Sequence, residues 1–257
     1  METVRKEKCR YELLDSIRGL VLISMIVFHA CWDLVYIFGK DWAWYQGTGA
    51  YIWQQSICQT FILLSGFCWS LGKKPAKRGL TVFLAGALVS AVTVLFLPQD
   101  RVVFGVLTLI GSCMLLTVLL HRILKYVPSV IGLAGCGFLF IITRNINSGY
   151  LGLKGVNAFR LPTGLYKGLF MTYLGFTSPD FYSTDYFSLF PWLFLFLTGY
   201  FLFGVLNKTD RGEIMNKYFI RGVNPLSFLG KHSLIIYMLH QPVIYGVFML
   251  LKGWNIL

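Results

Sequence analysis

The chain has 257 residues, of which 56 % are hydrophobic and only 13 % are charged, whereas a soluble domain devotes about a quarter of its residues to charge. This composition excludes an ordinary soluble domain and is typical of an integral membrane protein. The formal net charge of +12 would fit a nucleic-acid partner in a soluble protein, but here the basic residues lie mainly between apolar segments. No nucleic acid is therefore expected as a partner.

Seven apolar segments approach the roughly 20 residues that a helix needs to cross a hydrocarbon core. Because lipid offers no partners to backbone polar groups, these segments predict an all-α fold, a polytopic transmembrane helical bundle. We expect a single domain over residues 1–257, with spans at 13–38, 49–71, 79–97, 102–120, 127–143, 186–206 and 227–251. The basic start runs into the first span without a small-residue cleavage signal, so this span is expected to be retained.

The loops indicate an orientation. The first fourteen residues and the loops 73–78, 121–125 and 207–222 hold fourteen Lys and Arg, whereas the opposite side holds seven. Because basic loops stay in the cytoplasm, we expect a cytoplasmic N-terminus, and the short loops suit a bacterial cytoplasmic membrane. The long segment 145–185 would then be extracytoplasmic. It predicts either a folded cap, with a re-entrant piece near 164–176, or a loop that lies on the membrane surface.

Four ionisable residues fall on one face of the first span. At about 100° per residue, Arg18 and His29 lie within about 20° of each other, and Asp15 and Asp33 widen this face to about 120°. Ionisable groups in a membrane normally face the bundle interior and mark a site. The spacing of His29 and Asp33 favours a general base held by a carboxylate. A structural interpretation stays open, in which Arg18 reaches the headgroups, Asp15 pairs with it and His29 is a packed core residue.

Other spans add polar groups. In the second span, Gln59 lies one helical turn after Gln55, and its side chain either lines a polar interior or forms a hydrogen bond to a neighbouring helix. In the seventh, Tyr237 and His240 share a face, and Lys231 near its start could meet an anionic ligand.

Near the sixth span, Pro191 is expected to start or kink the helix, with Asp185 at its N-terminal end. The six cysteines lack metal-ligand spacing, so we expect packing residues and no metal.

Four segments resemble, in order, the bacterial membrane family related to the catalytic domain of heparan-alpha-glucosaminide N-acetyltransferase: "LLDSIRGLVLISMIVFHACWDL", "FILLSGFCWSLGKK", "DYFSLFPWLFLFLTGYFLFG" and "LSFLGKHSLIIYMLHQP". The first and last also resemble the wider group of transmembrane acyltransferases, in which an arginine and a histidine separated by ten residues recur, as Arg18 and His29 do. The resemblance implies transfer of an acyl group, usually acetyl, from cytoplasmic acyl-CoA to a hydroxyl or amine of an extracytoplasmic glycan or glycolipid. The region "FGKDWAWYQG" lacks the histidine of the lysosomal enzyme, so a heparan-type acceptor is not implied.

The resemblance also implies roles. The acetyl-CoA site would include Arg18, Asp15, Lys231 and Gln59, with Arg18 and Lys231 holding the phosphates at the inner face. His29, oriented by Asp33, would deprotonate the acceptor or carry the acyl group, and Tyr237, His240 or Gln59 would donate a hydrogen bond to the oxyanion.

Seven spans are fewer than the ten or so of the wider group, so a homodimer could complete the site. The alternatives are a transporter or carrier of a polar or lipid-linked substrate and a non-catalytic membrane scaffold.

Overall fold

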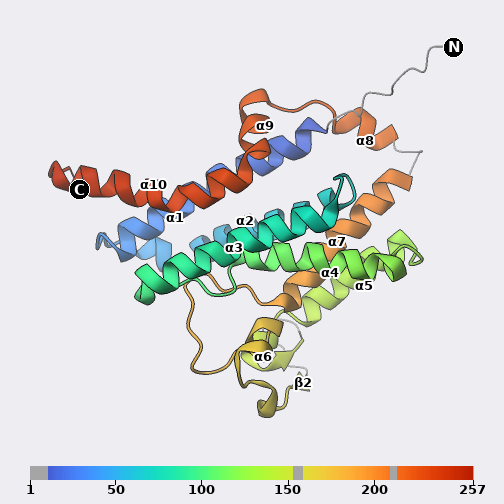
Figure 1. Cartoon of the computed structure of the whole chain (residues 1–257), viewed down its shortest axis with the longest axis horizontal. Helices are drawn as coiled ribbons and strands as arrows, with labels where there is room; N and C mark the ends of the chain where they lie inside the picture. Colours follow the sequence, from blue (N-terminus) through green and yellow to red (C-terminus); the bar gives the residue numbers. More distant parts are fainter. Residues whose placement is uncertain (1–10, 153–158, 209–212, 257) are drawn as a thin grey trace. The chain divides into compact units, whose positions relative to one another are not determined.

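A computed structural model describes residues 11–152, 159–208 and 213–256 (Figure 1). Some of the basic residues that were used to predict the orientation lie outside the described residues, namely those in segment 1–10, Lys154 and Arg211. The chain divides into two compact units, one of residues 1–57 and 206–257 and the other of residues 58–205.

Seven long helices correspond to the seven predicted spans, namely α1 Glu12–Tyr36, α2 Thr48–Trp69, α3 Pro75–Phe96, α4 Val106–Leu124, α5 Ser129–Ile142, α7 Leu189–Lys208 and α10 Ser233–Gly253. Within the described residues, six segments are long and apolar enough to cross a membrane, and α2 is not among them. Glutamines at 54, 55 and 59 make α2 less apolar than the others. The prediction of an all-α, multi-pass helical fold is confirmed.

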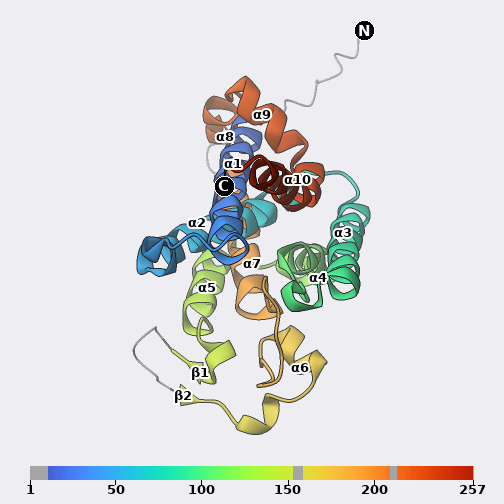
Figure 2. The same ribbon diagram turned by 90° about the vertical axis from the view of Figure 1, so that its left-hand side faces the viewer.

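The first unit is built on α1, which packs against α9 (Asn224–Lys231) and α10. Both ribbon views show these three helices together (Figure 2). A short helix, α8 (Glu213–Tyr218), precedes α9. The predicted last span, 227–251, is wrong at its start: α9 ends at Lys231, and α10 begins at Ser233 after a non-helical His232 (φ −102°, ψ 16°). The break allows α9 to cross α1 while α10 follows a direction of its own.

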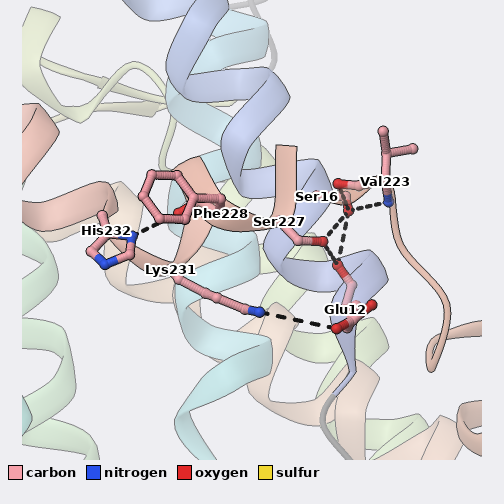
Figure 3. Close-up of polar contacts among 7 residues, drawn as sticks. All are labelled: Glu12, Ser16, Val223, Ser227, Phe228, Lys231 and His232. Atoms are coloured by element: carbon pink, nitrogen blue, oxygen red, sulfur yellow. Dashed lines mark hydrogen bonds and ion pairs between the residues drawn. The ribbon is translucent and has the colours of Figure 1, made fainter. Parts of the chain in front are cut away.

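The crossing of α1 and α9 brings two backbones into contact (Figure 3). A Cβ atom added at Gly19 would lie 2.1 Å from the carbonyl oxygen of Leu226, and one at Gly230 would lie 1.9 Å from that of Asp15. Beside them the hydroxyls of Ser16 and Ser227 are hydrogen-bonded at 2.7 Å. Small residues of this kind allow helices to approach closely in a membrane.

The second unit contains α3 and α4, which lie side by side as an antiparallel pair (Figure 2). Glycines again permit contact, since a Cβ at Gly199 of α7 would lie 2.0 Å from the Leu63 carbonyl oxygen of α2. Phe190 is extended (φ −95°, ψ 137°), so the regular helical part of α7 begins at Pro191, as the sequence predicted.

The long loop, residues 145–185, is folded where the structure describes it. It contains three short helical turns, η3 (Ile146–Ser148), η4 (Thr163–Leu165) and α6 (Leu169–Leu174), and the antiparallel strands β1 (Tyr150–Leu151) and β2 (Phe159–Arg160). Its end corrects one expectation. Asp185 lies four residues before α7 and its Oδ2 accepts a hydrogen bond from the Val106 N–H at 3.4 Å, so its carboxylate caps α4 and not α7.

Candidate active site

Two histidines from different helices of the first unit meet between α1 and α10. The rings of His29 on α1 and His240 on α10 have centroids 4.9 Å apart, with planes inclined at 61°. Asp33, one turn after His29, is fully buried, and the ring of Tyr237 lies 5.1 Å from that of His240. The structure therefore brings together the four residues that the sequence predicted for the chemical step.

The backbone fixes the tautomer of His240. Its Nδ1 is within hydrogen-bonding distance of the Tyr237 carbonyl oxygen, and a carbonyl can only accept, so Nδ1 carries the hydrogen. The lone pair then resides on Nε2, which is buried and has no hydrogen-bond partner among the described residues. A neutral imidazole nitrogen in this state can accept a proton from an O–H or N–H group.

Asp33 is held by a residue that sequence analysis did not assign to the site. The side-chain amide of Gln241 donates to Asp33 Oδ1 at 2.5 Å. Because Gln241 directly follows His240, this bond joins α1 to α10 at the level of the histidine pair. Gln241 Oε1 is buried and is not hydrogen-bonded to any of the described residues.

Aromatic residues from η1 (Ala43–Gln46) and the start of α2 pack behind the pair. The ring of Phe28, next to His29, lies 5.2 Å from both Tyr45 and Trp53. The Tyr45 hydroxyl donates to the Phe28 carbonyl at 2.9 Å, and the Trp53 indole donates to the Ser24 hydroxyl at 2.7 Å. Burial of its ring raises the pKa of Tyr45, so this phenol stays neutral and acts as a hydrogen-bond donor.

The residues predicted for the donor phosphates lie at the other end of α1, and both cations are paired. Arg18 contacts Asp15 at 3.1 Å. Lys231 lies 4.0 Å from a Glu12 oxygen (Figure 3). The Arg18–Asp15 pair is what the structural interpretation of the sequence expected. At about 1.5 Å per residue, Arg18 is about 16 Å along α1 from His29.

Gln59, the remaining predicted residue, is on the part of α2 that belongs to the second unit, where its side chain is partly buried. In the parts of the chain that the structure describes, no group of His, Cys, Asp or Glu side chains could hold a metal ion.

Two features of the site were missed from the sequence. Gln241 was assigned no role from the sequence, although its place beside an intramembrane histidine is a signal for a polar contact. The α1–α9 crossing was missed as well, although a matched pattern existed: Ser16 and Gly19 are three residues apart, as are Ser227 and Gly230.

Comparison with known families gives one match. The model of the family "Heparan-alpha-glucosaminide N-acetyltransferase, catalytic" matches residues 10–242, which include the histidine pair, Asp33 and Gln241. Neither a curated protein nor a solved structure matches the chain.

Proposed function

Because the chain belongs to the family of the catalytic domain of heparan-alpha-glucosaminide N-acetyltransferase, a family of membrane acetyltransferase type, we propose that it transfers an acetyl group from cytoplasmic acetyl-CoA to a hydroxyl or amine of an extracytoplasmic glycan or glycolipid. The observation that carries the proposal is the pair of histidines, His29 and His240, within the matched residues. The proposal includes a cytoplasmic N-terminus and a bacterial cytoplasmic membrane.

His240 is the proposed general base. Its Nε2 takes the proton of the acceptor O–H or N–H as the acceptor atom attacks the thioester carbonyl. The new C–O or C–N bond forms, the C–S bond breaks, and the departing thiolate of CoA recovers the proton, either from His240 or through His29 beside it. In the alternative, a nitrogen of His29 attacks the thioester carbonyl, the C–S bond breaks, and the departing CoA thiolate recovers the proton that His29 loses. The acceptor then attacks acetyl-His29 while His240 takes its proton, and this proton passes to the departing His29 ring.

Asp33 and Gln241 are the proposed positioning residues. Their hydrogen bond holds α1 against α10 at the level of the two rings.

Arg18 is the proposed contact for the phosphates of acetyl-CoA, and its pairing with Asp15 makes this role testable in two directions. A phosphate that binds Arg18 must compete with the carboxylate 3.1 Å away. Arg18→Ala should therefore weaken acetyl-CoA binding about tenfold, whereas Asp15→Asn should strengthen it.

The test is calorimetric binding of acetyl-CoA to the protein in nanodiscs, followed by release of the CoA thiol in the presence of glycan acceptors. His240→Ala and His29→Ala should leave binding intact and slow transfer about 10²- to 10⁴-fold. His121→Ala is the matched control, since His121 is an exposed histidine of the second unit, hydrogen-bonded to the Tyr200 hydroxyl. Absence of acetyl-CoA binding by folded protein would reject the donor and make transport the function to assay.

A further inference from the structure

A second candidate site lies in the long loop, within the second unit. The first turns of the loop and its later part line an open pocket of about 700 Å³, within the range of about 300–1,000 Å³ that is usual for small-molecule sites. Its lining includes Tyr150, Arg160, Tyr166, Lys167, Ser178 and Asp180. This cavity is called the loop pocket below.

Hydrogen bonds within the loop hold the walls of the loop pocket. The Leu161 N–H donates to the Gly149 carbonyl at 2.8 Å, and the Tyr166 hydroxyl donates to the Ile146 carbonyl at 2.6 Å. On the other wall the Ser178 N–H donates to the hydroxyl of Thr172, a fully buried residue, at 3.0 Å. The walls of the loop pocket are therefore held by backbone groups as well as by side-chain hydroxyls of the loop.

The charges and polar groups of the loop pocket suit a phosphorylated sugar. Arg160 and Lys167 outnumber Asp180, and among the described residues neither cation forms a salt bridge. Arginine binds phosphate oxygens through paired N–H groups and lysine binds them as a point charge. The hydroxyls and peptide groups of the lining can hydrogen-bond sugar hydroxyls, and the two tyrosines offer ring surface.

Exposed apolar side chains stand next to both cations in the sequence. Phe159 precedes Arg160 and is 62 % exposed, while Leu169 and Phe170, just after Lys167, are 65 % and 68 % exposed. Exposed apolar side chains near the cations along the chain suit an amphiphile, whose phosphate and sugar enter the loop pocket while its hydrocarbon chain contacts these side chains.

We propose that the loop pocket binds a saccharide that carries a phosphate group, and that this compound is the acetyl acceptor. The second clause rests on the proposed function, whereas the first does not. The phosphosugar comes either from a lipid-linked molecule or from a water-soluble sugar phosphate, and the exposed side chains of Phe159, Leu169 and Phe170 favour the lipid-linked source.

The experiment measures binding to the protein in uncharged phosphatidylcholine nanodiscs with four probes: glucose, glucose 1-phosphate, decyl phosphate, and glucose linked through phosphate to a decyl chain. We expect glucose 1-phosphate to bind at least about tenfold more tightly than glucose, and the decyl conjugate to bind more tightly still. Arg160→Gln with Lys167→Gln should weaken both phosphosugars about tenfold, and Thr163→Trp should block them by filling the cavity. Lys125→Gln, which removes an exposed cation of the same unit outside the loop pocket, should change nothing.

Equal binding of glucose and glucose 1-phosphate, no binding of either, or full binding by the double variant would overturn the proposal. Decyl phosphate binding as well as the conjugate would overturn its sugar part. Equal affinity of the conjugate and glucose 1-phosphate would assign the water-soluble source. Acetyl-CoA binding, measured on the same nanodiscs, separates the two proposals, since loss of phosphosugar binding alone leaves the transferase intact, and loss of acetyl-CoA binding alone leaves the loop pocket intact.

Discussion

Replacement of Gly230 by alanine tests whether the α1–α9 crossing holds the first unit together. The new Cβ would lie 1.9 Å from the Asp15 carbonyl oxygen, whereas real Cβ atoms essentially never approach closer than 3.0 Å. The two helices must therefore separate by about 1.1 Å. The Ser16–Ser227 hydrogen bond, now 2.7 Å, would lengthen to about 3.8 Å and be lost. Overpacking of this size costs about 1–3 kcal/mol and a lost buried hydrogen bond about 1 kcal/mol, so we expect about 2–4 kcal/mol of destabilisation.

The assay is thermal unfolding in nanodiscs, with Gly246→Ala as the control. A Cβ at Gly246, on α10 of the same unit, meets nothing within 4 Å, so this variant should unfold at the wild-type temperature or slightly above it. A second readout is the yield of a disulfide in the double variant Ser16→Cys/Ser227→Cys. This yield should fall when Gly230→Ala is added, because the two helices are then farther apart. Equal unfolding temperatures for Gly230→Ala and Gly246→Ala, with an unchanged disulfide yield, would refute the close crossing.

Three further predictions use the same unfolding assay. Gln241→Leu removes a hydrogen-bond donor to the buried Asp33 and should destabilise the protein by about 1–3 kcal/mol. The double variant Asp33→Leu/Gln241→Leu should lose less stability than the two single variants together, and losses that simply add would contradict the contact. Tyr45→Phe, which removes the bond to the Phe28 carbonyl, should cost about 1 kcal/mol and leave acetyl-CoA binding unchanged. Burial raises the pKa of Asp185 from 3.8 to about 6, so the stability that its protonated form contributes is fully present below about pH 4 and is lost as pH rises through 6. Asp185→Asn should therefore flatten the fall of stability with pH and stabilise the protein at pH 7 by up to about 3 kcal/mol. Identical pH profiles of the wild type and the variant would contradict the raised pKa.

The helices could be predicted from the sequence because the solvent dictates them. Apolar runs of about 20 residues must form helices in lipid, and each predicted span has a helix within a few residues of it, except where 227–251 divides into α9 and α10. That division could not be read from hydropathy, because Leu226, Phe228 and Leu229 continue the apolar pattern across α9. It depends on a tertiary contact, the approach of Gly230 to the backbone of α1.

The site could be predicted in part for a related reason. Helical periodicity places His29 and Asp33 on one face of α1, and Tyr237 and His240 on one face of α10, so each half of the cluster was visible locally. Which helix faces which is not a local property. The bond between Gln241 and Asp33 joins two helices and therefore required the packed structure, whereas the contact of His240 with the Tyr237 carbonyl lies within one turn of α10.

The segment "LDSIRG" illustrates why a motif and a site need to be separated. Its Ser16 and Gly19 make the close contact with α9, and its Asp15 and Arg18 pair with each other, so the segment has a complete structural role before any chemistry is assigned. A chain could keep this segment for packing alone. The catalytic proposal rests instead on the histidine pair, in which the buried His240 Nε2 accepts no hydrogen bond from any residue that the structure describes. If a His29→Ala/His240→Ala variant unfolds at the wild-type temperature but transfers no acetyl group, the segment "LDSIRG" has the structural role and the histidine pair has the catalytic role. Unfolding of that variant together with wild-type activity of each single variant would assign both to packing.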